Sequence, residues 1–355
     1  MVGDDYIGSD YMRNGFVLFQ EHGYELVESN WLHGGMDKMS EMNRVVEREG
    51  PEAVSVHDEV FDLIRDAEML VIQFLPVSGN LIDAAPELKY IGTLRTGLEN
   101  IDVKYAAGNG IKVFNTPGRL AETVSDYTVA FILAEARNIC RGHAALKQGK
   151  WRRNYHNNDF VPELRGHIAG LVGFGHIGRA VARKLSGFDM RVLACDPYVS
   201  GRQAKELAVE LVDLETLLKE SDFVSVHTNL TESTYHLIGR QELSLMKPTA
   251  IIVNTARGSI IDEEALIEAL EQRRIGGAAI DVFEHEPPGE NHPLLKLDNC
   301  TVTPHLAGTS VDCMINCPKM LARAMLSEII EGKPSGFLAG GPGAGSAKST
   351  KERQP

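Results

Sequence analysis

Apolar residues occur along this chain in two kinds of pattern. Runs of four or five apolar residues, typical of strands buried on both faces, alternate with stretches in which apolar residues recur every three or four positions, as on one face of a helix. The expected strands are 69–72, 90–94, 111–114, 168–172, 191–195, 223–227, 250–254, 277–281 and 300–303. A helix is expected around 81–88. Buried strands that alternate with helices predict an α/β fold with parallel, doubly wound sheets.

Two longer helical stretches stand apart from this alternation. Residues 122–148 are expected to form one helix that joins two domains, and residues 314–331 carry apolar residues at helical spacing. Each stretch fits a helix of the core or a helix at an interface between subunits. The pattern leaves both alternatives open.

Length and composition limit the class of protein. A chain of 355 residues is expected to form about two domains. Its net charge of −13 argues against a nucleic-acid or anionic-membrane surface. No basic and apolar leader opens the chain and no apolar run approaches the ~20 residues of a membrane span, so a cytoplasmic protein is expected. The five cysteines lack paired spacing, which predicts free thiols and no metal site. The tail, 340–355, is expected to be disordered.

A glycine motif follows one of the expected strands directly. The motif comes after 168–172 and reads Gly173-Phe174-Gly175-His176-Ile177-Gly178. Its glycines permit a tight turn, the approach of a pyrophosphate to the backbone, and close packing of the next helix, whose N-terminus attracts phosphate. Asp196 follows the next strand, where a carboxylate binds ribose hydroxyls and repels the 2′-phosphate of NADP. The motif therefore predicts NAD, and the alternative for Asp196 is a turn residue before Pro197.

Polar residues also follow later strands at their carboxyl ends, where an open α/β sheet binds its ligands. Arg257, in the run 254–258, could bind a carboxylate through two parallel hydrogen bonds, and the alternative is a surface salt bridge. Asp281 begins an acidic loop that extends to 288. His305 follows a Thr-Pro pair, in which the proline keeps the threonine extended. His227 follows another strand and competes for the same chemical role.

Together these stretches resemble the D-isomer-specific 2-hydroxyacid dehydrogenase family, which includes phosphoglycerate dehydrogenases and glyoxylate/hydroxypyruvate reductases. The resemblance covers about residues 69–334 and is carried, in the family's order, by residues 94–102, 115–118, 173–178, 254–258, 281–287 and 303–305. It implies two Rossmann-like or flavodoxin-like domains, with the cofactor domain inserted into a discontinuous substrate domain. The NAD-binding domain would be 117–306, and the substrate domain 1–116 with 307–335.

The resemblance also implies residue roles. His305 would be the general acid/base, Glu286 its hydrogen-bonded partner, and Arg257 the group that binds the substrate carboxylate and polarises the carbonyl. The backbone of Thr96 and Gly97 would complete the carboxylate site. Asp281 would orient the nicotinamide amide. The full set expected to bind cofactor is Gly173, Gly175, His176, Ile177, Gly178, Asp196, Thr228, Ala256 and Asp281.

The expected function is NAD-dependent hydride transfer between nicotinamide and C2 of a small D-2-hydroxy or 2-oxo acid, by a homodimer. An NAD-sensing corepressor-like binding protein on the same scaffold is the alternative. Formate dehydrogenases pair the histidine with glutamine, so Glu286 argues against them. The loop 73–78 has no arginine for a substrate phosphate, which favours an unphosphorylated acid, although Arg95, Arg119 or Arg152 could bind one. Of the family's apolar opening strand only Met1-Val2 is present, so either this strand is shortened or the true start of the chain lies upstream.

Overall fold

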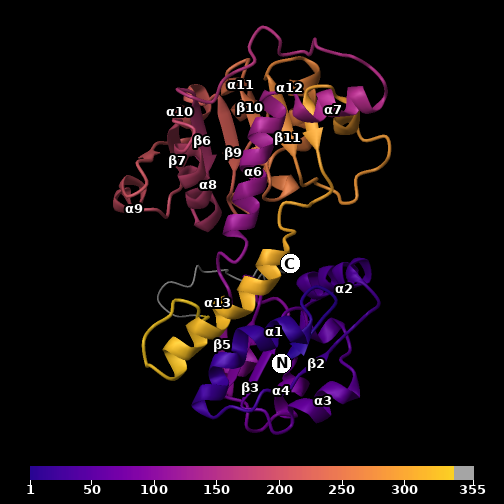
Figure 1. Cartoon of the computed structure of the whole chain (residues 1–355), viewed down its shortest axis with the longest axis vertical. Coiled ribbons are helices and arrows are strands. Elements are labelled where there is room, and N and C mark those ends of the chain that lie inside the picture. Colours follow the sequence, from indigo (N-terminus) through magenta and orange to yellow (C-terminus); the bar gives the residue numbers. More distant parts are fainter. Residues whose placement is uncertain (340–355) are drawn as a thin grey trace, which may run out of the picture. The chain divides into compact units, whose positions relative to one another are not determined.

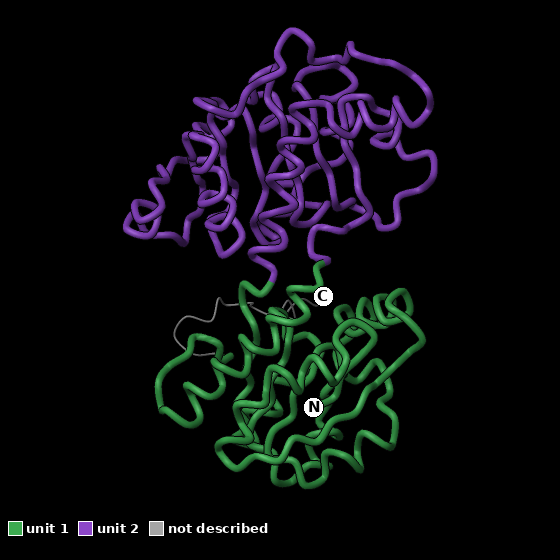
Figure 2. The backbone as a smooth tube through the Cα atoms, viewed as in Figure 1, with its two compact units in different colours: residues 1–119, 310–355 green, residues 120–309 purple. Residues whose placement is uncertain are grey.

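The computed structural model of this chain describes residues 1–339, and the tail predicted to be disordered lies outside the described residues. The chain divides into two compact units (Figure 2). The first unit is Met1–Arg119 with the chain from Ser310 onward, and the second is Leu120–Thr309. Both boundaries between the units lie three residues after the predicted ones, at 119 instead of 116 and at 309 instead of 306.

The first unit contains a parallel sheet of five strands in the order β2-β1-β3-β4-β5 (Figure 1). The strands are β1 Val2–Gly3, β2 Ser29–Asn30, β3 Met69–Ile72, β4 Tyr90–Thr93 and β5 Lys112–Phe114. The helices are α1 Ser9–Phe16, α2 Met36–Glu49, α3 Asp58–Ile64, α4 Gly79–Asp83, α5 Val103–Gly108 and α13 Val311–Ile329, with 3-10 turns at Val17–His22 and Pro51–Ala53. The strand order reverses between β1 and β3, which places the sheet's switch point there.

Alternate residues of these strands enter two cores, one on each face of the sheet. Leu70 and Ile72 pack with α2, α3, α4 and α5, whereas Val71 packs with α1 and α13. The opening strand β1 lies inside this sheet, because Val2 pairs with Ser29 on one side and Ile72 on the other.

The second unit contains a parallel sheet of seven strands in the order β12-β11-β10-β9-β6-β7-β8. The strands are β6 Ile168–Val172, β7 Arg191–Cys195, β8 Glu210–Leu211, β9 Phe223–Val226, β10 Ile251–Asn254, β11 Gly277–Ile280 and β12 Cys300–Val302. The helices are α6 Ala121–Ala136, α7 Ile139–Lys147, α8 His176–Ser186, α9 Gly201–Lys205, α10 Leu214–Glu220, α11 Arg240–Leu245 and α12 Glu263–Glu271, with 3-10 turns at Gly258–Ile260 and Pro293–Lys296. Here the order reverses between β6 and β9.

Helices cover both faces of this second sheet. α6 packs beside α8 on one face (Figure 1), and α10, α11 and α12 supply the apolar side chains of the other. The predicted fold class, α/β with two doubly wound parallel sheets, is confirmed.

The predicted single helix over 122–148 is wrong. The chain forms α6 and α7, and between them Asn138 adopts a left-handed conformation with φ 57°. Asparagine tolerates this region better than most residues, and its side-chain Nδ2 donates to Asn157 Oδ1 at 2.7 Å. The break lets Arg141 of α7 turn back and form a buried ion pair with Glu135 of α6.

The helix expected over 81–88 is also shorter than predicted. α4 ends at Asp83, two residues before Ala85. Pro86 follows Ala85, and a proline disfavours helical geometry in the residue before it. The predicted stretch 314–331 lies within or just beyond α13, whose apolar face packs into the first unit. Among residues 1–339, no helix is long and apolar enough to cross a membrane.

Candidate active site

The glycine motif forms the turn between β6 and α8, in the conformation that its sequence requires. Gly173 has φ 98°, and a Cβ there would lie 2.7 Å from the backbone N of Thr228, so a side chain is excluded. A Cβ on Gly178 would lie 2.4 Å from the carbonyl oxygen of Gly173, which shows how closely α8 packs on the turn. At Gly175 nothing lies within 4 Å of the equivalent position. The backbone is therefore open to a ligand at the first turn of α8.

Asp196 lies beside this turn. One carboxylate oxygen accepts a hydrogen bond from Phe174 N at 2.8 Å, and the other accepts one from Tyr198 N at 2.9 Å. The carboxylate thus joins the turn after β7 to the glycine turn after β6. His176 and Ile177 begin α8 next to it, and the former is exposed. The structure therefore brings the two predicted parts of the dinucleotide site together.

His305 and Glu286 form a hydrogen-bonded pair, with His305 Nδ1 2.8 Å from Glu286 Oε2. The other oxygen of Glu286 accepts from Phe283 N at 3.1 Å, which fixes the carboxylate. The hydrogen bond from Glu286 raises the pKa of His305 above its ordinary value, although burial and the positive charge of Arg257 oppose the shift. Burial acts to raise the pKa of Glu286, but the hydrogen bond from His305 and the charge of Arg257 hold it below its ordinary value. The pair therefore favours imidazolium and carboxylate.

Asp281 is fully buried below the loop that carries His305. Its carboxylate accepts hydrogen bonds from Thr303 Oγ1 at 2.5 Å and from the backbone N of Leu306 and of Ala307, each at 2.8 Å. Its carbonyl oxygen accepts from His305 N at 2.8 Å. This support of the loop was not predicted, and contact with the nicotinamide amide stays a prediction for Asp281.

Arg257 lies on the tight turn after β10. Asn254 shapes that turn, because its Oδ1 accepts from Ala256 N at 3.0 Å and its Nδ2 donates to the Arg257 carbonyl at 2.9 Å. The guanidinium is exposed and donates to the Ala256 carbonyl at 2.7 Å. Its positive charge acts on both His305 and Glu286. The three predicted catalytic residues therefore lie together at the carboxyl edge of the sheet.

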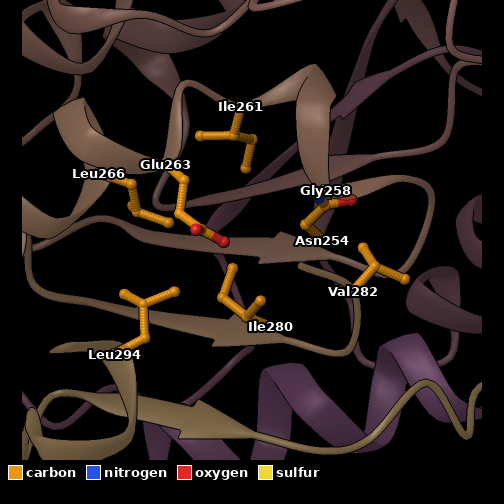
Figure 3. Close-up of a pocket in the computed structure, with 8 residues that line it drawn as sticks. All are labelled: Asn254, Gly258, Ile261, Glu263, Leu266, Ile280, Val282 and Leu294. Atoms are coloured by element: carbon orange, nitrogen blue, oxygen red, sulfur yellow. The ribbon is translucent and has the colours of Figure 1, made fainter. Parts of the chain in front are cut away.

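Glu263, which was not predicted from the sequence, supports the loop after β11 that carries Glu286. Its Oε2 accepts from Glu284 N at 3.2 Å, and its Oε1 lies 2.9 Å from His292 Nε2. Figure 3 shows this carboxylate among aliphatic side chains. The pocket is lined by Asn254, Gly258, Ile261, Glu263, Leu266, Ile280, Val282 and Leu294. In the sequence, Glu263 follows Asp262 and indicates only the start of a helix.

His227, the competing histidine, is poorly suited to proton donation. Burial lowers the pKa of His227 to about 3, so the ring is neutral at neutral pH. Its buried Nε2 has no hydrogen-bond partner among residues 1–339. Burial sets this shift, whereas the hydrogen bond from Glu286 raises the pKa of His305.

The remaining predicted site residues, Thr96 and Gly97, belong to the first unit and lie in the turn after β4. Thr96 is held from two sides, because its hydroxyl donates to the Thr116 carbonyl at 3.2 Å and its own carbonyl accepts from Asn115 Nδ2 at 2.6 Å. The described part of the chain holds no group of three or more His, Cys, Asp or Glu that could bind a metal ion. All five cysteines are free thiols.

Comparison with known proteins identifies the family. Residues 129–307, which lie inside the second unit, match the model for the D-isomer specific 2-hydroxyacid dehydrogenase, NAD binding domain. A glyoxylate reductase of Korarchaeum cryptofilum is 40% identical over 78% of this chain and 88% of its own. A hydroxypyruvate reductase of Thermotoga maritima is 42% identical over 76% of this chain and 88% of its own.

A solved structure agrees with these relatives. The D-lactate dehydrogenase of Lactobacillus jensenii, determined with NAD⁺, superposes with a TM-score of 0.73 at 25% identity and covers 95% of this chain and 99% of its own. The predicted NAD cofactor is confirmed by the family match, whereas the relatives give no support to the corepressor alternative. The chain therefore belongs to the D-isomer specific 2-hydroxyacid dehydrogenase family of NAD-dependent enzymes.

Proposed function

We propose that this enzyme interconverts a small 2-oxo acid and its D-2-hydroxy acid, with His305 as the general acid/base. The observation that carries the proposal is the His305–Glu286 hydrogen bond, which is 2.8 Å long and lies at the carboxyl edge of the sheet near the charge of Arg257. A proton donor and a carboxylate-binding cation are the two groups that reduction of a 2-oxo acid requires.

The residues around the glycine turn fit an NAD molecule. The open space at Gly175, the N–H groups at the start of α8 and the carboxylate of Asp196 match a pyrophosphate and an adjoining ribose. Thr228 and Ala256 lie at the ends of neighbouring strands and complete the proposed set with His176 and Ile177. Bound nicotinamide supplies or accepts the hydride.

His305 donates a proton during reduction and accepts one during oxidation. Its Nδ1 faces Glu286, so Nε2 is the ring nitrogen left to donate to the carbonyl oxygen of the substrate during reduction. The raised pKa of His305 keeps the donor protonated toward neutral pH. In the reverse direction the neutral ring accepts the hydroxyl proton, and Glu286 stabilises the imidazolium that forms.

Arg257 binds the substrate carboxylate and polarises the carbonyl. Its planar guanidinium can donate two parallel hydrogen bonds to a carboxylate, and the Asn254 hydrogen bonds hold the turn from which it projects. Thr96 and Gly97 are part of the proposal as backbone ligands of the substrate. The proposed enzyme is a homodimer and is located in the cytoplasm.

The test is a panel of 2-oxo acids with NADH, including glyoxylate, hydroxypyruvate and pyruvate, followed by the loss of nicotinamide absorbance. We expect turnover of at least one acid by wild type, and loss of most turnover in His305→Ala with NADH binding intact. A protein that binds NADH but reduces none of the acids would contradict the proposal. Equal activity of His305→Ala and wild type would remove His305 from the mechanism.

A further inference from the structure

At the carboxyl edge of the first unit's sheet lies Arg95, an arginine that forms ion pairs with carboxylates of its own unit. Arg95 comes two residues after β4, and Phe74 comes two residues after β3. Phe74 thus adjoins the switch point between β1 and β3, which is where doubly wound sheets bind ligands, and Arg95 follows the next strand at the same edge. Arg95 is only 6% exposed, and its guanidinium lies over the Phe74 ring, 4.9 Å from the centroid.

Two carboxylates and an amide engage this arginine. Arg95 NH2 lies 2.6 Å from Glu47 Oε1 and 3.5 Å from Glu99 Oε2, and NH1 donates to Asn43 Oδ1 at 2.5 Å. Glu47 and Asn43 are four residues apart on α2, which places them on one face of that helix. We call Glu47, Arg95 and Glu99 the Arg95 cluster.

The carboxylates of the Arg95 cluster remain accessible although the arginine is buried. Their side chains are 44% and 45% exposed, compared with 8% for Arg95. Glu99 lies against the turn proposed for the substrate, because a Cβ at Gly97 would be 2.2 Å from Glu99 Oε2. A substrate at this turn would therefore meet carboxylate oxygens more readily than the guanidinium.

The charge of the Arg95 cluster is −1, from two carboxylates and one guanidinium. Arg119 is a further cation that acts on Arg95. Its NH1 contacts Cys313 Sγ at 3.6 Å, and with Arg119 counted the charges around Arg95 balance, so selection depends on the exposed carboxylates and not on net charge. Ionised carboxylates accept hydrogen bonds and cannot donate them, so they attract hydroxyl groups and repel phosphate.

We propose that the Arg95 cluster determines substrate choice by accepting an uncharged, hydroxyl-bearing end of the 2-oxo acid and disfavouring a phosphorylated end. The inference rests on the proposed function, because it assumes that Thr96 and Gly97 bind substrate. Arg95 holds the two carboxylates in place through ion pairs, and Glu47 and Glu99 discriminate between hydroxyl-bearing and phosphorylated acids. Loss of either carboxylate leaves Arg95 less neutralised and more attractive to a phosphate.

The test compares kcat/KM for hydroxypyruvate and for 3-phosphohydroxypyruvate, with NADH, in wild type and variants. Wild type should prefer hydroxypyruvate. Glu47→Gln and Glu99→Gln keep the side-chain shape but remove one charge each, so the preference should fall by about fivefold to tenfold. The fall should shrink at high ionic strength, since salt screens half-exposed charges. Thermal melting shows whether each variant is folded. If one variant fails to fold, the other still tests the inference.

Glu49→Gln is the matched control. Glu49 lies on the same helix and pairs with Arg48, so its removal changes the net charge equally without touching Arg95. Its substrate preference should equal that of wild type. An unchanged preference in the folded Glu47→Gln or Glu99→Gln variant would overturn the inference. The inference would also be overturned if wild type preferred the phosphorylated acid and Arg119→Gln abolished that preference. Failure of every 2-oxo acid would instead overturn the proposed function.

Discussion

His305 Nδ1 lies 2.8 Å from Glu286 Oε2, although the two residues belong to different loops of the second unit. The loop of His305 follows β12 and is held by Asp281, and the loop of Glu286 follows β11 and is held by Glu263 through Glu284. The charge state of the histidine therefore depends on how firmly both loops are held.

The first prediction concerns the charge of Glu286. Glu286→Gln keeps the shape of the side chain but removes the charge that raises the pKa of His305. Reduction needs protonated His305, so the alkaline limb of kcat/KM for reduction should move to lower pH. Glu290→Gln, an exposed neighbour on the same loop, is the control and should leave the limb in place. A limb that stays put or rises in Glu286→Gln would separate the two residues functionally.

The second prediction concerns Arg257. Arg257→Lys keeps the charge but loses the planar pair of donors, so KM for the 2-oxo acid should rise and kcat should fall, together lowering kcat/KM about a hundredfold. NADH affinity, measured by fluorescence titration, should stay within about twofold. Weak NADH binding with normal turnover at saturation would show instead that Arg257 is a cofactor residue.

Much of this site follows from sequence because its residues stand directly after strands. The apolar run before Gly173 places the glycine turn, and the same logic places Arg257 and His305 at one sheet edge. The three hydrogen bonds to the Asp281 carboxylate come from residues 22 to 26 positions away in the chain, and no local pattern reports them.

Other features could not be predicted, because the local sequence pattern fits more than one structure or is too short to be recognised. Helical periodicity continues through Asn138, and only its distant partner Asn157 reveals the break between α6 and α7. The strands β2 and β8 have two residues each, too few for an apolar run to show. Glu263 has the local signature of a first helical turn, and its support of the Glu284 backbone depends on the folded loop.

The third prediction concerns cofactor choice. Asp196→Ser removes the carboxylate that should bind ribose hydroxyls and repel a 2′-phosphate, so the preference for NADH over NADPH should fall at least about tenfold. The measurement is kcat/KM for both cofactors with one 2-oxo acid. Because Asp196 also accepts from Phe174 N, Asp196→Asn separates loss of charge from loss of the hydrogen bond. An unchanged ratio in both variants would exclude Asp196 from cofactor selection.

The fourth prediction concerns the proposed homodimer. α6 and α13 bury Ile132 and Leu321 within their own units, whereas Ile139 and Leu146 of α7 are 56% and 59% exposed. Exposed apolar residues of this kind favour an interface between subunits. Light scattering should give about twice the chain mass of 39.0 kDa, and Leu146→Glu should shift the protein toward monomer. A wild-type monomer at micromolar concentration with full activity would contradict the dimer.

The fifth prediction assigns Glu263 a positioning role. Its carboxylate accepts from Glu284 N and contacts His292, so it supports the loop that brings Glu286 to His305. Glu263→Gln retains one acceptor but loses the charge, which should weaken both contacts. We expect a free energy of unfolding lower by about 1–3 kcal/mol and kcat lower by about tenfold.

A purely structural role for Glu263 predicts loss of stability alone, so the pH profile separates the two roles. If the loop positions Glu286, the alkaline limb of reduction should move to lower pH in Glu263→Gln, as in Glu286→Gln, because His305 is then paired less well. The double variant should shift the limb no further than Glu286→Gln alone, since both changes act on one interaction. Glu264→Gln is the matched control, because this exposed neighbour lies in the same first turn of α12. An unmoved limb in a folded Glu263→Gln variant, at a temperature well below its Tm, would leave Glu263 with a role in stability only.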